Sequence, residues 1–401
     1  MLQPLPAPFI RCRRGLLVPG FLANAVRATT RYRVRGYFSD RDGHRLSHRF
    51  FARHFLDDPD EAEEFWSRLR RSEAGEIARW PSWLPGLGEF PGLTYELATV
   101  TFLTGSPGSN QTYTSPEDWN NDNNLIEGLG AGGSGGLTRN AANDTLSSSG
   151  GGGGAYQRHT NFSFASPGTT TATYQLGTGG AGGASASDLT AAGTAGGDTW
   201  FDGASYGAST VGAKGGDGGN AAVGGSGAAG VSGGAAASGR GNSTAYNGGG
   251  SGTAYFNTRQ TATGGGGAAG MNAAGGTSAN SSGSGGSAQF TAGGQGDGSS
   301  GGTGGAGSSG SSASDGVAGT EWDGSHGSGG GGGGNLRNNA SGTSGGGGLY
   351  GAGSGGGAIT GGSGTLTVKD GAQGLIVVTY TPPLSFFGKL SRGVRATYLR
   401  R

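Results

Sequence analysis

Alternation of apolar and polar residues predicts a β-hairpin near the start of the chain. Within residues 30–38, Tyr32 and Val34 alternate with basic residues, which is the pattern of a strand with two different faces. The turn residues at 39–43 predict that residues 44–51 return as the second strand. The basic positions of the first strand are Arg31, Arg33 and Arg35.

A helical pattern follows the hairpin. Asp57 or Asp58 can cap a helix that starts at Pro59, because an aspartate oxygen accepts hydrogen bonds from the free N–H groups of the first turn. Trp80 and Trp83 come after this helix, and they either cover it, which is the interpretation we favour, or form an exposed docking motif. Residues 1–92 are therefore predicted to form a small α+β domain. The expected buried face of the helix carries Ala62, Phe65, Trp66 and Leu69.

From residue 93 onwards the pattern is that of β-strands separated by glycine. Residues 93–103 and 374–381 are rich in β-branched and aromatic side chains, as are residues 171–177. Residues 124–133 begin with the same strand pattern and run directly into glycine. The sequence thus predicts a mainly β, partly irregular domain over residues 93–383.

Large apolar side chains are sparse between Gly128 and Gly374. This stretch holds 84 of the chain's 96 glycines, about a third of its residues. It cannot form an ordinary hydrophobic core, since each ordered glycine also gives up more backbone freedom than any other residue. Such a composition is typical of disorder. However, aromatic residues recur along the stretch and strand patterns flank it, so we expect it to be ordered.

The form of that order follows from the spacing of glycine and proline. Collagen requires glycine at every third position and abundant proline, whereas this stretch has one proline, Pro167, and uninterrupted glycine runs at 150–154 and 329–334. A sheaf of extended helices of polyglycine II type fits better. Such helices have no internal hydrogen bonds, so their N–H and C=O groups must bond to neighbouring helices.

Charge separates the two ends of the chain from its middle, although the net charge is only +1. Residues 1–100 carry 15 basic and 12 acidic side chains, residues 101–383 carry 7 and 14, and residues 384–401 carry 5 and none. We interpret the N-terminal arginines as a solvated or partner-docking face. Nucleic-acid binding is the alternative for an arginine-rich segment, but the hairpin alternation already explains these residues, and nucleic acid is not expected as a partner.

The chain carries no pattern typical of export or membrane insertion. Cys12 is the only cysteine, so no disulfide can form within one chain. The apolar stretch at 16–22 is short and contains Pro19, and no run approaches the ~18 apolar residues of a membrane span. We expect the protein to be made in a cytoplasm without a signal peptide.

Candidate catalytic and metal-binding patterns are weak. His44, His48 and His54 lack the cysteines or carboxylates that would complete a metal site, and Gly-x-Gly-x-x-Gly recurs by chance in a glycine-rich stretch. We therefore expect no enzyme activity, no cofactor and no metal. The alternative is a carboxylate pair for glycoside hydrolysis. The candidates for such a pair are Asp198, Asp202, Glu321 and Asp323.

The order of the strand and glycine motifs carries a family resemblance. The motifs lie at 99–103, 113–119, 124–133, 152–156, 166–168, 171–177, 196–203, 213–216 and 374–380. This order resembles the glycine-rich domain of tailed-bacteriophage tail fibre and tail-tip proteins. The resemblance covers about residues 93–382 and implies a shell of strands from both ends of the domain around glycine-rich excursions. It also implies a virion protein that adheres to the host, and a homotrimer is one possible assembly.

On this basis the ends of the chain and the loops of the glycine stretch receive different expected roles. Residues 1–92, together with the basic tail 384–401, are expected to attach the protein to other virion proteins, with Arg31, Arg33, Arg35, Trp80 and Trp83 as candidate contacts. Polar and aromatic loops are expected to recognise a host-surface saccharide or protein, because rings stack on apolar faces while polar groups fix orientation. The candidate residues are Tyr246, Tyr255, Phe256, Arg259, Trp322, His326 and Arg337.

Three other functions stay open at this point. The protein is alternatively a head decoration protein, a glycine-rich extracellular structural protein, or a polysaccharide-depolymerising tailspike. Tyr246 and Tyr255 are nine positions apart, and we expect them to lie on the same or adjoining loop tips. Trp200, Phe201 and Trp322 are expected to fill gaps between the glycine segments and the strands, whereas Tyr255, Phe256 and Arg259 are expected to be exposed.

Overall fold

A computed structural model describes residues 98–142, 145–224, 227–255, 260–281, 289–297 and 300–382. The chain divides into two compact units, one formed by Thr99–Tyr380 and the other by the residues before and after it. The fold described below is that of Thr99–Tyr380. The hairpin and helix expected within residues 1–92, the three histidines and the basic tail lie outside the described residues.

A five-stranded antiparallel sheet joins the first and last strands of the unit. Its strands, in spatial order, are β1 (Thr99–Leu103), β20 (Leu375–Tyr380), β3 (Asn124–Leu129), β6 (Tyr156–Thr160) and β13 (Ala245–Tyr246). Val377 in β20 lies opposite Phe102 on one side and Glu127 on the other. The first and last strands, expected from their β-branched and aromatic sequences, are confirmed, and the structure pairs them with each other.

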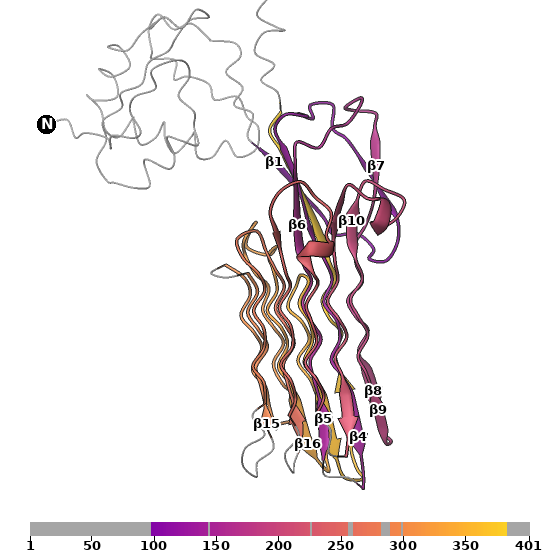
Figure 1. Ribbon diagram of the computed structural model, residues 1–401, viewed down its shortest axis with the longest axis vertical. Helices are drawn as coiled ribbons and strands as arrows, with labels where there is room; N and C mark the ends of the chain where they lie inside the picture. Colours follow the sequence, from indigo (N-terminus) through magenta and orange to yellow (C-terminus); the bar gives the residue numbers. More distant parts are fainter. Residues whose placement is uncertain are drawn as a thin grey trace, which may run out of the picture. The chain divides into compact units, whose positions relative to one another are not determined.

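A four-stranded sheet lies at the same end of the unit as the five-stranded sheet. In Figure 1 this end carries the labels β1 and β6 of the five-stranded sheet and β7 and β10 of the four-stranded sheet. The strands of the four-stranded sheet are β11 (Val211–Ala213), β10 (Thr199–Phe201), β7 (Thr171–Gln175) and β2 (Gln111–Thr114). Aromatic side chains from both sheets and their loops pack together, so we call this the aromatic end. Its cluster includes Tyr113, Trp119, Phe162, Phe164, Tyr174, Phe201 and Tyr380.

Short strands form three further sheets at the opposite end, which we call the tip (Figure 1). The first contains β12 (Ala221–Val223), β5 (Leu146–Ser148), β14 (Thr261–Ala262) and β15 (Gln289–Phe290). The second contains β16 (Asn335–Asn338), β18 (Gly357–Thr360), β4 (Leu137–Asn140) and β9 (Leu189–Ala191). The third contains β17 (Gly342–Thr343), β19 (Leu366–Val368) and β8 (Gly183–Ser185). Two small apolar clusters, which include Leu137, Ile359, Leu146 and Leu336, lie beneath the turns of the tip.

Extended glycine-rich segments run side by side between the two ends (Figure 1), and we call them the glycine body. They include 130–136, 149–155, 193–197, 214–219, 248–252, 263–269, 328–334, 344–348 and 351–356. Hydrogen bonds between their backbones hold these segments together. The N–H groups of Gly130, Gly133 and Gly136 donate to the carbonyls of Ala155, Gly152 and Ser149, at 2.9 Å each.

The neighbour that receives the hydrogen bond changes from one residue to the next in this first segment. Ala131 and Ser134 donate to Gly197 and Thr194, at 3.1 and 2.9 Å, whereas Gly132 donates to Ala372 at 2.8 Å. Residues 130, 133 and 136 thus point to one neighbour and residues 131 and 134 to a second, whereas Gly132 donates to Ala372 and Gly135 to the hydroxyl of Ser354. The segments are therefore bonded on several sides rather than along two edges as in a flat sheet.

The spacing of the segments leaves no room for a side chain at many interior glycines of the glycine body. A Cβ atom added at Gly153 would lie 2.0 Å from the carbonyl oxygen of Gly267, and one added at Gly331 would lie 2.1 Å from that of Gly265. Real Cβ atoms do not approach backbone atoms so closely. Glycine at these positions is needed for the close approach of one backbone to another.

The described residues are mainly β-strand, as the sequence predicts. Within those ranges, helical turns occur only as two three-residue 3₁₀ helices, Tyr206–Ala208 and Ala236–Ser238. The expected burial of Trp200 and Phe201 is confirmed, since both are at most 4% exposed. The interior thus consists of an aromatic end and a glycine body, joined through β3, β6 and β20.

Candidate functional site

The candidate recognition residues belong to four polar and aromatic segments, 242–246, 253–259, 319–326 and 335–339, whose described residues divide between the two ends of the unit. Residues 242–246 contact β6, and residues 319–326 contact β1 and β3, so both lie at the aromatic end. Residues 335–339 overlap β16, and residues 253–255 precede β14, so both lie at the tip. Only the two loops of the tip lie at the end of the unit opposite the aromatic cluster.

Tyr246 and Tyr255 lie at opposite ends, so the expectation that they share a tip is wrong. Tyr246 stacks on Tyr156 at 6.3 Å between ring centroids, whereas Ala254 bridges Ala228 and Ser281 near the tip. The residues between them form one complete segment of the glycine body. An extended chain rises ~3.1 Å per residue, so nine residues span about 28 Å. This segment is bonded to 228–234 and 267 along its length.

Trp322 and His326 are built into the aromatic end. The indole N–H of Trp322 donates to a carboxylate oxygen of Glu127 at 3.0 Å, which agrees with the expectation that Trp322 fills a gap. The His326 ring stacks on Phe102 at 3.8 Å, and on its other side it stacks on Tyr350 at 5.8 Å. Its Nδ1 lies 2.8 Å from Asp323, which fixes the orientation of the imidazole.

Glu127 is a buried carboxyl group, 3% exposed, where the aromatic end meets the glycine body. Besides Trp322 it accepts a hydrogen bond from the Tyr156 hydroxyl at 2.5 Å. Burial raises the pKa of the Glu127 carboxyl, while these two hydrogen bonds and the charge of Arg158 oppose the rise in part. Burial also raises the pKa of Tyr156, and the nearby Glu127 adds to that effect. The group therefore belongs to a buried network rather than to an open site.

The carboxylates considered for glycoside hydrolysis each have a partner of their own. Asp198 forms an ion pair with Lys214 at 2.7 Å, and Asp202 accepts a hydrogen bond from Thr210 at 2.6 Å. Glu321 accepts hydrogen bonds from the backbone and hydroxyl of Ser328. Asp323 accepts hydrogen bonds from Ser325 and His326, which lower its pKa to about 2.

Arg337 is the one other candidate recognition residue that the described part of the tip contains. It belongs to β16, and its guanidinium donates to the carbonyls of Ser309 at 2.8 Å and Ser341 at 3.1 Å. Tyr255 is 48% exposed, as expected. Phe256 and Arg259 lie outside the described residues, as do Arg31, Arg33, Arg35, Trp80 and Trp83.

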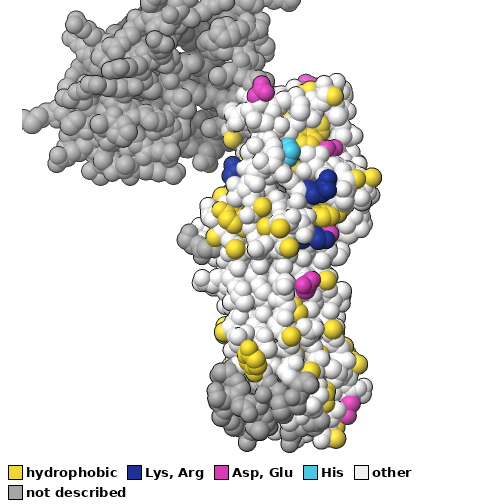
Figure 2. All heavy atoms as spheres, in the orientation of Figure 1, with side chains coloured by type: hydrophobic (Ala, Val, Ile, Leu, Met, Phe, Trp, Pro, Cys, Tyr) yellow, Lys and Arg dark blue, Asp and Glu magenta, His cyan; other side chains and the backbone are white. Residues whose placement is uncertain are grey.

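The surface of the tip combines exposed apolar side chains with hydroxyl and amide groups. Leu189, Tyr255 and Phe290 are each more than a third exposed. The surrounding turns are rich in serine and asparagine, as at 185–187, 308–312 and 338–341. On the face shown in Figure 2, Lys, Arg, Asp and Glu side chains are sparse over the lower half of the unit. The tip surface thus presents apolar side chains beside groups that can donate and accept hydrogen bonds.

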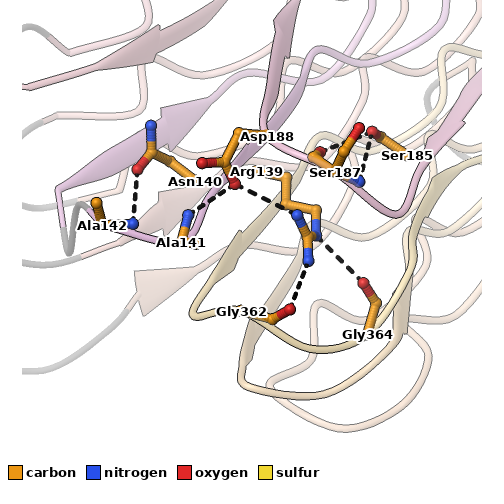
Figure 3. A network of polar contacts seen from close by, with 9 residues as sticks. All are labelled: Arg139, Asn140, Ala141, Ala142, Ser185, Ser187, Asp188, Gly362 and Gly364. Atoms are coloured by element: carbon orange, nitrogen blue, oxygen red, sulfur yellow. Dashed lines mark hydrogen bonds and ion pairs between the residues drawn. The ribbon is translucent and has the colours of Figure 1, made fainter.

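Arg139 is the residue of the tip that the sequence interpretation missed. It is 3% exposed, and its guanidinium donates to the carbonyls of Gly362 and Gly364, at 3.2 Å each (Figure 3). It also forms an ion pair with Asp188 at 3.3 Å. The sequence did carry one indication of this role: Arg139 is an isolated arginine between two glycine segments, at 130–136 and 149–155. A charge inside such a region needs partners.

Comparison with known proteins adds no further constraint. No protein-family model matches this chain, and no curated protein matches it either. None of the helical turns within the described ranges is long and apolar enough to cross a membrane. The functional assignment therefore rests on the sequence and on the geometry of Thr99–Tyr380.

Proposed function

We propose that the chain is a structural component of a phage virion, a tail fibre or tail-tip protein that contributes to recognition of the host surface without catalysis. The observation that carries the proposal is the glycine body, which holds the turns of the tip away from the aromatic end by backbone hydrogen bonds. Side chains of the tip turns are therefore free to vary without loss of the interior. That is the property an adhesive surface requires.

The glycine body is, on this proposal, a sheaf of polyglycine II type. The period of three in its hydrogen bonds supports this, since helices with three residues per turn present every third N–H to the same neighbour. A sheaf of this kind is narrow and stiff, and its backbone groups are bonded and so resist proteolysis. These properties suit a particle that meets its host outside the cell.

The two ends of the unit then have different partners. The chain enters at Thr99 and leaves at Tyr380, both in the sheet of the aromatic end, so residues 1–92 and 384–401 are joined to that end. We assign those residues to attachment within the virion tail and the tip to the host. Tyr255, Phe290 and Arg337 are the described residues that we assign to contact with a saccharide or protein of the host surface. Trp322 and Tyr246 instead pack against a second buried cluster, which includes Tyr156 and Tyr350.

Binding of the purified, fluorescently labelled chain to a panel of whole bacterial cells tests the proposal. We expect saturable staining of some strains, which unlabelled chain competes away. No staining of any strain, together with labelling of particle heads in electron micrographs, would favour a head decoration protein. Release of soluble oligosaccharide from the cells would instead favour the depolymerising tailspike.

A further inference from the structure

Arg139 occupies the point at which several turns of the tip converge (Figure 3). It projects from β4 toward the turn between β18 and β19, where it donates to the carbonyls of Gly362 and Gly364. Its third contact is Asp188, in the turn between β8 and β9. The same oxygen of Asp188 accepts a hydrogen bond at 2.8 Å from the N–H of Ala141, in the turn after β4. The guanidinium thus joins the turn between β18 and β19 to the turn between β8 and β9, and Asp188 extends this connection to the turn after β4.

The connection continues from these turns to Arg337. The hydroxyl of Ser363 donates to the carbonyl of Asn339 at 2.8 Å, and the N–H of Thr365 donates to the hydroxyl of Ser341 at 3.0 Å. Arg337 in turn donates to the carbonyls of Ser341 and Ser309. The described turns named here therefore form one connected polar network with an arginine at each side of it.

Burial of a guanidinium removes it from water, and the half-exposed Asp188 is the only carboxylate with which it pairs among the described residues. The guanidinium of Arg139 also donates hydrogen bonds to the carbonyls of two turn residues. A lysine would supply a single point charge and could not hold two carbonyls and a carboxylate in the same planar arrangement. The residue is thus suited to fixing the geometry of turns that have no strand pairing of their own.

We propose that Arg139 is a positioning residue for the recognition surface of the tip. It holds the turns at 140–142, 186–188 and 361–364 in one fixed arrangement before a ligand arrives. Binding to a preorganised surface loses less conformational entropy than binding to mobile turns. This inference rests on the proposed recognition function, and it adds a buried residue that would contact no ligand itself.

The test compares Arg139→Lys with Arg240→Lys in the full-length chain. Arg240 is the control at the other end of the unit: its guanidinium also donates to a backbone carbonyl, that of Ser209, although the residue is exposed. Amide hydrogen exchange of the three turns and staining of bacterial cells are measured for each variant, with thermal unfolding as the check on the fold. For Arg139→Lys we expect exchange in the turns to be about tenfold faster and cell binding about tenfold weaker, the change that loss of one or two hydrogen bonds to a charged group gives. Arg240→Lys should leave both unchanged.

A second variant covers the case in which Arg139→Lys fails to fold. Asp188→Ala removes the acceptor shared by Arg139 and Ala141 at a half-exposed position, and it should produce a smaller change of the same kind. Unchanged exchange in both variants would overturn the proposal, as would faster exchange with full cell binding. If the unmodified chain stains no cells, the recognition function fails, and with it the effect of Arg139 on binding. Faster exchange would then still show that Arg139 holds the turns.

Discussion

Phe201 and Gly331 are both interior residues, but they lie in opposite surroundings. The site of Phe201 is filled by a large side chain, whereas the site of Gly331 has no room for one. Phe201, at the aromatic end, is 1% exposed and packs against the rings of Phe162 at 5.4 Å and Tyr113 at 5.8 Å. Gly331, in the glycine body, has a backbone carbonyl where its first side-chain atom would be. The aromatic end is stabilised by burial of large side chains, whereas the glycine body is stabilised by backbone hydrogen bonds between close-packed segments.

This difference shows how one unit can be rigid without a continuous hydrophobic core. Apolar burial is non-directional and scales with area, so it suits an end that must anchor strands of several orientations. Backbone hydrogen bonds are directional and regular, so they can hold extended segments in register over a long distance. The two interiors should therefore respond differently to substitution, pH and loss of surface side chains.

The largest expected effect is in the glycine body. Gly331→Val places a branched side chain 2.1 Å from the carbonyl oxygen of Gly265, so the two segments must separate and lose their hydrogen bonds. We expect the free energy of unfolding to fall by more than ~4 kcal/mol, measured by urea unfolding with circular dichroism. Gly207→Val is the matched control, since no atom lies within 4 Å of its added Cβ. Equal stability of the two variants would contradict the close packing of the body.

At the aromatic end, removing a buried side chain should destabilise the fold strongly, just as adding a side chain does in the glycine body. Phe201→Ala leaves a cavity among Tyr113, Phe162 and Tyr174. Substitutions of this kind typically reduce the free energy of unfolding by about 3–5 kcal/mol. Thermal and urea unfolding measure the loss, with the exposed Val317→Ala as the control. A loss below ~1 kcal/mol would mean that the aromatic cluster contributes little to stability.

Glu127 should make the junction between the two regions sensitive to pH. Its folded-state pKa is raised above the unfolded value of ~4.3, so the folded state binds more protons than the unfolded state between these two values. The contribution of Glu127 to stability is therefore fully present below pH ~4 and is lost as pH rises through the folded pKa. The facing groups are Tyr156, Arg158 and the indole of Trp322.

Glu127→Gln isolates this contribution from those of other groups. Relative to the unmodified chain, the variant should gain stability as pH rises from 4 to 8, with a difference of ~1.4 kcal/mol for each unit of pKa shift removed. Urea unfolding at several pH values provides the measurement. Glu321, whose pKa burial also raises, is the comparison, because Glu321→Gln should show a similar trend. A constant difference between Glu127→Gln and the unmodified chain at all pH values would contradict the assignment.

The strands of the aromatic end could be predicted from the sequence because their own residues specify them. Residues 99–103 and 375–380 are strongly β-branched and aromatic, and both form strands as expected. The tip strands could not be predicted in this way. Strand β5 reads Leu-Ser-Ser and β14 reads Thr-Ala, and both owe their conformation to neighbours rather than to a local pattern.

The candidate site was predicted only in part, for physical reasons that differ between residues. The exposure of Tyr255 could be predicted because the residue lies in a polar loop. Its separation from Tyr246 could not, because an extended segment crosses the whole glycine body in only nine residues. The role of Arg139 depends on turns at 186–188 and 361–364, and all three of its contacts there are 49 or more positions away in sequence. No local sequence signal can report partners so distant.

The smallest expected effect on stability, and the largest on binding, is at the surface of the tip. Tyr255→Ala with Phe290→Ala removes two exposed rings from the end opposite the aromatic cluster. Neither ring belongs to a buried cluster, so the free energy of unfolding should change by no more than about 0.5 kcal/mol per substitution. Exposed aromatic anchors commonly contribute more than ~1 kcal/mol each to binding, so staining of bacterial cells should fall about tenfold or more.

The control is Val317→Ala, an exposed substitution on the glycine body, which should leave staining intact. Full staining by the double variant would move the recognition surface away from these two rings, and equal losses in both variants would indicate that the whole length of the unit contacts the cell.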